Sequence, residues 1–230
     1  MKKIKIYSEV NYILAILLLA FAVAMITCTN FGVSMVVAPA YVFSRKFTFL
    51  TFGQSEYIIQ AVVFIFFCLL IRKFKLVYLS SFLTCVIYGA VLDAFRFFIP
   101  VFNPAVTAPN SIPFIMKIIF FILGILLTTL SIAMFYRTYF YPQVYDFFVK
   151  GVSEHFNFNR TKFKIICDVL FLVLASVMSL LFFKKFVGVG WGTLVITCVN
   201  GILIGLFGKL LDKYFEVVPA FKKLATKFEL

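Results

Sequence analysis

Six long apolar segments follow one another along this 230-residue chain and constrain its fold more than any other feature. A helix needs about 20 predominantly apolar residues to cross the ~30 Å hydrocarbon core of a bilayer. The segments that meet or approach this length are 10–30, 57–71, 77–99, 114–136, 165–183 and 191–211. They predict an all-α, polytopic transmembrane helical bundle of about six spans, in which the short second span begins near Gly53 or crosses upright.

The composition indicates that lipid is the solvent of this chain. Apolar residues make up 63% of it and charged residues 13%, against roughly 45–50% and about 25% in soluble domains. The formal net charge of +13 raises the alternative of nucleic-acid binding, which needs Lys and Arg gathered on one soluble face. They lie instead in short groups between the apolar segments, where they meet anionic headgroups. The expected partner is therefore the lipid bilayer, and nucleic acid is not expected.

The distribution of basic residues predicts the orientation in the membrane. Cytoplasmic connections of membrane proteins are enriched in Lys and Arg. With the N-terminus inside, 16 of the 22 basic residues are cytoplasmic, from Lys2 in the first group to Lys227 in the last. The outer side keeps Arg45, Lys46, Arg96, Lys117, Lys184 and Lys185. We therefore place the chain in a bacterial-type plasma (inner) membrane, with both termini in the cytoplasm.

Side chains suited to catalysis or metal binding are scarce and scattered. The five cysteines lie singly in apolar segments, and the one histidine, His155, lies in a polar connection. No Cys or His pair has metal-ligand spacing, and no Ser/His/Asp set is available. The chain has no ATP-binding motif, so a role driven by ATP would need a separate ATPase. We expect no enzyme activity, no catalytic residue, no metal and no cofactor.

The two halves of the chain resemble each other at a fixed offset of 109 residues. Eleven of the 36 residues in 14–49 are identical to their counterparts in 123–158, where composition alone would give roughly three. Three spans per half place the halves in opposite orientations, as in the inverted repeats of many secondary transporters. The connections 31–52 and 140–163 are amphipathic and contain a proline each, which predicts interfacial or re-entrant half-helices. A repeat retained only for assembly is the alternative interpretation.

The repeat divides the chain into three predicted parts. Residues 1–105 form the first three-span half, residues 106–211 the second half, and residues 212–230 a cytoplasmic amphipathic tail that mixes Phe, Leu and Val with Lys. In transporters built from inverted repeats, the binding site lies between the halves near the membrane midplane.

Glycine-containing turns, and one pair of basic residues that ends the second apolar segment, occur at defined places along the chain. They are Gly32-Val33-Ser34 after the first span, Gly53 near the second, Arg72-Lys73 after it, Gly89-x-x-x-Asp93 in the third, and Gly190-x-Gly192-Thr193 at the last. Together these motifs resemble the bacterial YczE/YitT type of integral membrane protein over most of the chain. The resemblance implies topology rather than activity, because the function of that family is obscure. In size and number of spans alone, the chain is also similar to the substrate-binding subunits of energy-coupling-factor vitamin transporters.

Ionisable residues inside the spans need a reason, because a charged side chain costs at least ~2.5–3.5 kcal/mol at the centre of a span. Asp93 and Arg96 share a helix face at i, i+3, where they either form an ion pair near the outer interface or line a path for a solute or proton. Glu56 and Gln60, at i, i+4, form a polar stripe. This stripe either bonds neighbouring helices together or faces a solute.

Further candidates lie in the second half. Asp168 follows Lys164 by four residues and is either a snorkelling acid or a functional group, and Asn200 near the middle of the sixth span either bonds across helices or contacts a ligand. Gly201-x-x-x-Gly205 predicts close helix packing. The candidate ligand-binding residues are Gly32, Ser34, Pro39, Glu56, Gln60, Asp93, Arg96, Asp168 and Asn200.

Two functions remain open from the sequence. The first is a carrier or solute-binding transporter subunit for a small molecule, with its site between the halves. The second is a membrane scaffold or accessory protein that transports nothing and acts through a protein partner, in which case function depends on the connection 137–164. A membrane or ATPase partner is compatible with either function.

Overall fold

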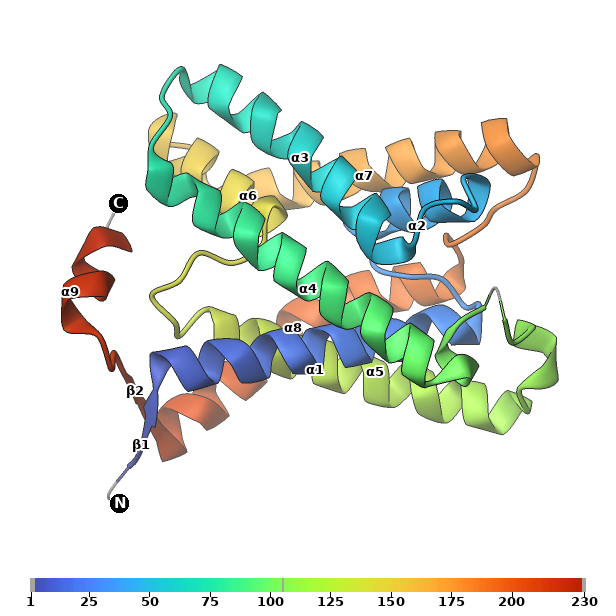
Figure 1. Cartoon of the computed structure of the whole chain (residues 1–230), viewed down its shortest axis with the longest axis horizontal. Coiled ribbons are helices and arrows are strands. Elements are labelled where there is room, and N and C mark those ends of the chain that lie inside the picture. Colours follow the sequence, from blue (N-terminus) through green and yellow to red (C-terminus); the bar gives the residue numbers. More distant parts are fainter. Residues whose placement is uncertain (1–2, 105, 229–230) are drawn as a thin grey trace.

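The structure, a computed structural model, describes residues 3–104 and 106–228 and is a bundle of helices (Figure 1). Lys2 of the first basic group and residue 105, the predicted end of the first half, lie outside the described residues. Among the described residues, six helices are long and apolar enough to cross a membrane, which confirms the predicted number of spans. They are α1 (Ser8–Thr29), α3 (Phe52–Ile71), α4 (Leu79–Phe98), α5 (Phe114–Phe135), α7 (Arg160–Phe183) and α8 (Trp191–Tyr214).

Capping side chains explain where the second and fifth spans begin. Thr51 Oγ1 accepts a hydrogen bond from the Gln54 backbone N–H, and Gln54 Oε1 accepts one from the Thr51 backbone N–H, both at 3.0 Å. This capping box starts α3 at Phe52, so the second span has full length and begins near Gly53. Asn159 Oδ1 accepts from the Lys162 backbone N–H, and α7 therefore begins at Arg160, earlier than the predicted residue 165.

Each half contains a short helix between its first and second spans, α2 (Ala38–Lys46) and α6 (Val144–His155). The order span, short helix, span, span thus occurs twice, and α1 and α5 run in opposite directions (Figure 1). After α1 and after α5 the chain turns back into the bundle before the short helix begins, as predicted for re-entrant segments. We term the end of the bundle with both chain termini the terminal end, and the opposite end, where α1 ends and α3 begins, the distal end.

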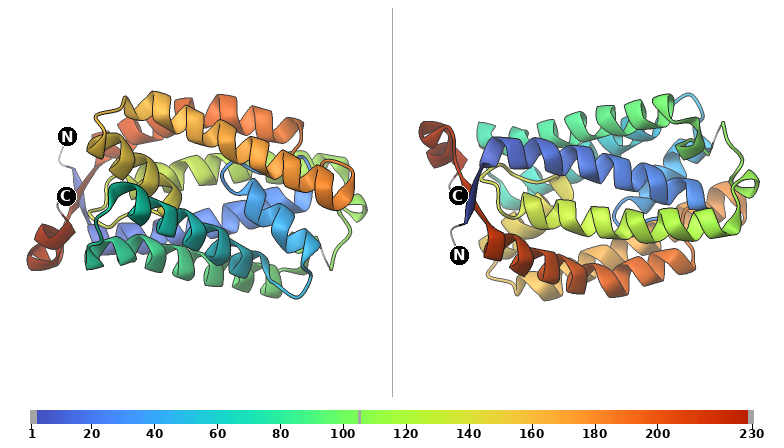
Figure 2. Two further views of the ribbon diagram at one scale, coloured as in Figure 1. Left: turned by 90° about the horizontal axis from the view of Figure 1, so that it is seen from above. Right: turned by 90° about the horizontal axis from the view of Figure 1, so that it is seen from below.

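The helices form two layers. In the first layer α4, α1, α5 and α8 lie side by side in this order (Figure 2). In the second layer α3 and α7 are separated by α2 and α6, which contact both of them. The Val144 N–H at the start of α6 meets Gln60 in the middle of α3, and Val37 before α2 shares a cavity with Asn200 in the middle of α8. Both short helices therefore begin at mid-depth and run outward, α6 to the terminal end and α2 to the distal end.

In the described part of the chain, one contact of the first half has no equivalent in the second. α3 packs so closely along α4 that a Cβ on Gly53 would lie 2.2 Å from the Gly89 carbonyl oxygen. α7 packs on α2 and α6 rather than along α8. Gly201 has the same place in α8 as Gly89 in α4, yet no described atom of another element lies within 4 Å of a Cβ added at Gly201 or Gly205. The close packing predicted for these two glycines is therefore wrong for the described part of the chain.

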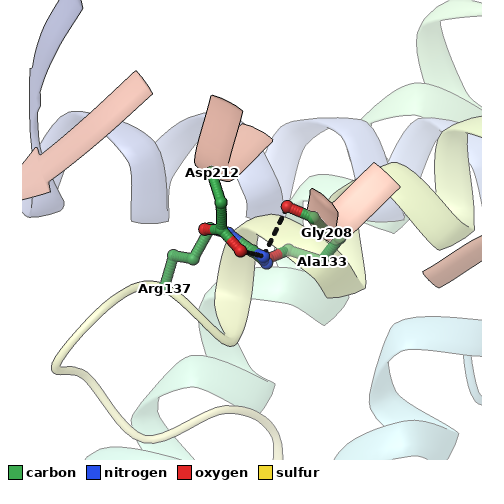
Figure 3. A network of polar contacts seen from close by, with 4 residues as sticks. All are labelled: Ala133, Arg137, Gly208 and Asp212. Carbon is green, nitrogen blue, oxygen red and sulfur yellow. Dashed lines mark hydrogen bonds and ion pairs between the residues drawn. The ribbon is translucent and has the colours of Figure 1, made fainter. Parts of the chain in front are cut away.

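Arg137 joins the ends of α5 and α8 at the terminal end (Figure 3). Its guanidinium forms a two-pronged ion pair with Asp212, with Nε–Oδ1 at 2.7 Å and Nη2–Oδ2 at 2.6 Å. It also donates to the carbonyl oxygens of Ala133 and Gly208. Paired bonds of this kind fix geometry as well as charge, so Arg137 has a structural role beyond the orienting charge counted from the sequence.

A parallel pair of short strands joins the two ends of the chain. In β1 (Ile4–Tyr7) and β2 (Phe215–Val218), Ile4 lies beside Phe215 and Tyr7 beside Val218. The predicted amphipathic tail is therefore divided into β2, α9 (Lys222–Ala225) and a 3₁₀ turn. The 3₁₀ turns are Leu76–Tyr78, Pro100–Phe102, Pro109–Ser111 and Thr226–Phe228.

Glu9 ties this strand pair to the bundle. Its carboxylate accepts hydrogen bonds from the backbone N–H groups of Ala220 and Phe221 and from the Tyr139 hydroxyl. Burial and the bond to Glu9 raise the pKa of Tyr139 above its usual range, so its hydroxyl remains a donor. One carboxylate thus connects α1, the α5–α6 connection and the tail.

Candidate functional site

Gln60 holds the beginning of α6 against the middle of α3. The first N–H groups of a helix have no partner within the helix, and Gln60 Oε1 accepts from the Val144 N–H at 3.1 Å. Its Nε2 donates to Gln143 Oε1 at 3.3 Å and to Glu56 Oε2 at 3.0 Å. Gln60 is fully buried, so this amide satisfies polar groups that water does not reach. The predicted polar stripe of Glu56 and Gln60 is thus one continuous hydrogen-bonded unit.

Glu56 is a buried acid that pairs with no cation among the described residues. Its side chain is 0% exposed, and Oε2 accepts from Gln60 and, at 3.4 Å, from the Tyr145 hydroxyl. Within the described part of the chain Oε1 has no hydrogen-bond partner and no Lys or Arg pairs with the carboxyl group. A buried carboxylate is stable only with a cation, further donors or a bound proton. Oε1 of Glu56 therefore needs a bound proton or a partner that the described residues do not supply.

Two other buried polar atoms of this region also lack partners among the described residues. They are Nε2 of Gln143, which immediately precedes α6, and the hydroxyl of Tyr88 on α4. Tyr88 and Glu56 lie on α4 and α3, which pack against each other. Native proteins leave few such groups unsatisfied, and those that remain call for a water, an ion or a ligand. We define Glu56, Gln60, Tyr88, Gln143 and Tyr145 as the Glu56 cluster.

A second group of unpaired polar atoms lies where the other re-entrant segment turns. A cavity of about 20 Å³ is lined by Ser34, by Thr128 of α5 and by Asn200 of α8, together with apolar residues of α1 and α8. Thr128 Oγ1 and Asn200 Oδ1 have no partner within the described residues. The cavity holds about one water. Ser34 and Gln143 are equivalent at the offset of 109, so both re-entrant segments bring a polar residue to mid-depth.

The predicted candidates Gly32 and Pro39 serve the fold around these groups. Gly32 has φ +112°, and a Cβ there would lie 2.5 Å from Thr193 Oγ1 at the start of α8. The backbone on either side is fixed by bonds from the Val33 N–H to the Gly188 carbonyl and from the Gly192 N–H to the Phe31 carbonyl. Pro39 lies in the first turn of α2, where its missing N–H costs nothing. Neither residue belongs to the Glu56 cluster.

Asp93 and Arg96 do not form the predicted ion pair among the described residues. Asp93 accepts from the Thr51 hydroxyl and, at 2.9 Å, from the Gly53 N–H. It therefore caps the positive N-terminal end of α3, an option that spacing along α4 does not reveal. Arg96 instead donates to Asn103 and lies over the Phe52 ring, and its Nε is buried without a partner in the described chain.

Asp168 lies in a network of ion pairs near the terminal end. Lys164 Nζ is 3.9 Å from Asp168 and 3.0 Å from Asp146 of α6, which favours the interpretation of Asp168 as a charge balanced locally. No described group of three or more His, Cys, Asp or Glu residues is arranged to hold a metal ion.

Sequence reasoning missed Tyr88, Thr128, Gln143 and Tyr145. Gln143 had a signal, because it follows Pro142 in the second re-entrant segment and aligns with the predicted candidate Ser34. The tyrosines and Thr128 had none, since single polar residues in apolar segments most often bond within their own helix or across to the next.

Residues 6–209 match a family described as a family of unknown function (DUF6198). The chain belongs to this family. The region shared with other DUF6198 members contains both re-entrant segments, the Glu56 cluster and the cavity at Ser34, and it ends before β2. No curated protein and no solved structure matched the chain. Membership of DUF6198 assigns no activity, so function has to be argued from the geometry of the site.

Proposed function

We propose that this protein is a carrier, or the solute-binding subunit of a transporter, for a small polar molecule. Its site is the interface of the two halves, where the re-entrant segments bring the Glu56 cluster and the cavity at Ser34 to mid-depth. The observation that carries the proposal is the buried Glu56 carboxyl, whose Oε1 lacks a partner in the described chain, as does Nε2 of Gln143 in the same cluster. Glu56 Oε1 is a free acceptor, and Gln143 Nε2 and the Tyr88 hydroxyl are free donors, within the described chain. This set of groups suits a polar solute, a proton or a cation.

The proposal includes the orientation of the chain in the membrane and its relation to a known family of membrane proteins. The distal end faces outward, because the greater number of Lys and Arg residues lies at the terminal end. The membrane is a bacterial-type plasma membrane, and the chain is a relative of the YczE/YitT type. It has no enzyme activity.

The unequal packing of the halves supports a transport cycle. Inverted repeats allow each half to adopt the arrangement of the other, which alternates access to a site between them. Here α3 lies along α4, whereas α7 is apart from α8. Such a difference between two similar halves is what one state of an alternating carrier requires.

A thermal-shift screen of the detergent-purified chain tests the proposal against vitamins, nucleobases, amino acids and organic anions. A ligand at a hundredfold excess over Kd stabilises by about 2.7 kcal/mol. At about 2–4 °C per kcal/mol this is a rise in melting temperature of roughly 5–10 °C. We expect a hit that Glu56→Gln and Gln143→Ala abolish.

The matched control is Glu154→Gln, which removes an exposed carboxyl near the end of α6 and leaves the hit intact. A ligand that stabilises all variants equally binds elsewhere and contradicts the assignment of the site.

A specific observation favours a second candidate, a scaffold that acts through a protein partner. Gly201 and Gly205 expose the backbone of α8, the least buried of the six spans, where small residues allow a helix to approach. On this alternative, Gly201→Leu releases a co-purifying membrane protein, while Glu56→Gln has no effect on its retention. The carrier proposal predicts the reverse dependence, since ligand binding requires Glu56 and tolerates a side chain at position 201.

A further inference from the structure

A larger cavity opens at the distal end, away from the Glu56 cluster. Its volume is about 450 Å³, within the range of about 300–1,000 Å³ that small-molecule sites occupy. Four segments contribute to it: the end of α1, the last turns of α2, the α4–α5 connection and the α7–α8 connection. The cavity therefore lies between the two halves. Its polar lining residues are Asn30, Tyr41, Arg45, Asn110 and Lys185.

The charge of this cavity is of one sign. Arg45 and Lys185 line it and no carboxylate does, and neither cation forms an ion pair with a described residue. Arg96 adds positive potential nearby, because its guanidinium lies over the Phe52 ring, which packs against the ring of Tyr41. Asp93, the acid nearest to Arg96 along α4, is engaged with Thr51 and Gly53. A cleft lined by one sign of charge concentrates ions of the opposite sign.

Helix ends alone do not explain this arrangement. Cations at the C-terminal ends of α2 and α7 complement the helix dipoles, and Lys46 and Lys184 sit at these same ends. Neither Lys46 nor Lys184 lines the cavity. The dipole thus accounts for a basic residue at each end but not for the fact that Arg45 and Lys185, from different halves, line the same cavity.

We propose that this distal cavity binds a small organic anion through a carboxylate or phosphate group held by Arg45 and Lys185. Arg45 offers a planar fork of donors and Lys185 a mobile ammonium, and the amides of Asn30 and Asn110 can donate to further oxygens of the ligand. The ligand is a free solute or the headgroup of an anionic lipid. The inference depends on the distal cavity alone and stands whether or not the chain is a carrier.

The test is a titration of the purified full chain with citrate, at constant ionic strength maintained with sodium chloride, followed by melting temperature. We expect a saturable rise that is retained in Lys46→Gln and Lys184→Gln. Arg45→Gln and Lys185→Gln each remove a charge-assisted contact and raise the apparent Kd about tenfold or more. Lys185 is exposed in a connection, so its substitution leaves a folded chain to measure even where Arg45→Gln does not.

A lipid arm distinguishes the two sources. The chain is reconstituted in nanodiscs of phosphatidylcholine alone and of equal parts phosphatidylcholine and phosphatidylglycerol. Stabilisation by phosphatidylglycerol but not by citrate, lost in Lys185→Gln and kept in Lys184→Gln, supports a headgroup site. Retention of the citrate response in Glu56→Gln would separate this site from the carrier site. The proposal is overturned if neither anion stabilises the chain, or if all four basic variants respond as the wild type does.

Discussion

Gly53→Ala tests whether the close contact of α3 with α4 holds the first half together. The added Cβ would lie 2.2 Å from the Gly89 carbonyl oxygen and 2.5 Å from Asp93 Oδ2. The first of these atoms belongs to the backbone, so α3 has to move away from α4 as a unit. That movement also lengthens the 2.9 Å bond from the Gly53 N–H to Asp93.

The expected cost follows from these two effects. Overpacking a well-filled contact costs about 1–3 kcal/mol, and weakening a hydrogen bond to a charged group adds up to about 1.5–3 kcal/mol. We expect at least about 2 kcal/mol in total, which lowers the melting temperature by roughly 4–8 °C for a chain of this length.

The assay is thermal unfolding in detergent, in which the area of the monodisperse peak in size-exclusion chromatography reports the folded fraction. The matched control is Gly201→Ala, at the same place in α8, where no described atom of another element lies within 4 Å of the new Cβ. We expect this control to unfold at or above the wild-type temperature, because Ala favours a helix interior over Gly by up to about 1 kcal/mol and its Cβ meets no described atom of another element. Equal melting temperatures for the two variants would refute the reasoning that the glycine contact is specific to the first half.

Three further predictions follow from polar contacts. Arg137→Gln should cost about 1–3 kcal/mol in thermal unfolding, since it removes bonds to two carbonyl oxygens as well as the ion pair, whereas Asp212→Asn should cost under about 1 kcal/mol because Asp212 is 64% exposed. Asp93→Ala should lower the free energy of unfolding by about 1–2 kcal/mol in the same assay, because the N-terminal end of α3 loses its cap. Asp93→Asn should have little effect on ligand binding in the thermal-shift screen. Glu9→Gln should speed tryptic cleavage after Lys222 while the rest of the chain stays resistant, because it weakens the bonds that hold the tail.

The spans and the re-entrant segments could be predicted because hydrophobicity over about 20 residues is a local property. The helix pair Glu56 and Gln60 was equally accessible, since i, i+4 spacing places two side chains on one face whatever surrounds them. The residues that this pair contacts could not be predicted from the spacing. Gln143 and Tyr145 reach it only because α6 returns to mid-depth beside α3, and no local pattern encodes that depth.

The wrong pairing of Asp93 has the same origin. Spacing along α4 offered Arg96, one turn away, whereas the structure offers the N-terminus of α3, whose proximity depends on two glycines in different spans. The strand pair could not be predicted from the sequence for another reason. Strands of four residues carry little periodic signal, and these two are separated by nearly the whole sequence.

The pairing of β1 with β2 sets the order in which the protein is completed. During synthesis β1 emerges first, and its partner follows only after all six spans have been made. Chains are synthesised at about 5–20 residues per second, so roughly ten seconds or more pass between the synthesis of β1 and that of β2. Until then β1 has no strand to pair with among the described residues. The pair therefore forms only in a chain whose last span has been made, and a nascent chain that stalls before residue 215 leaves β1 without its partner strand.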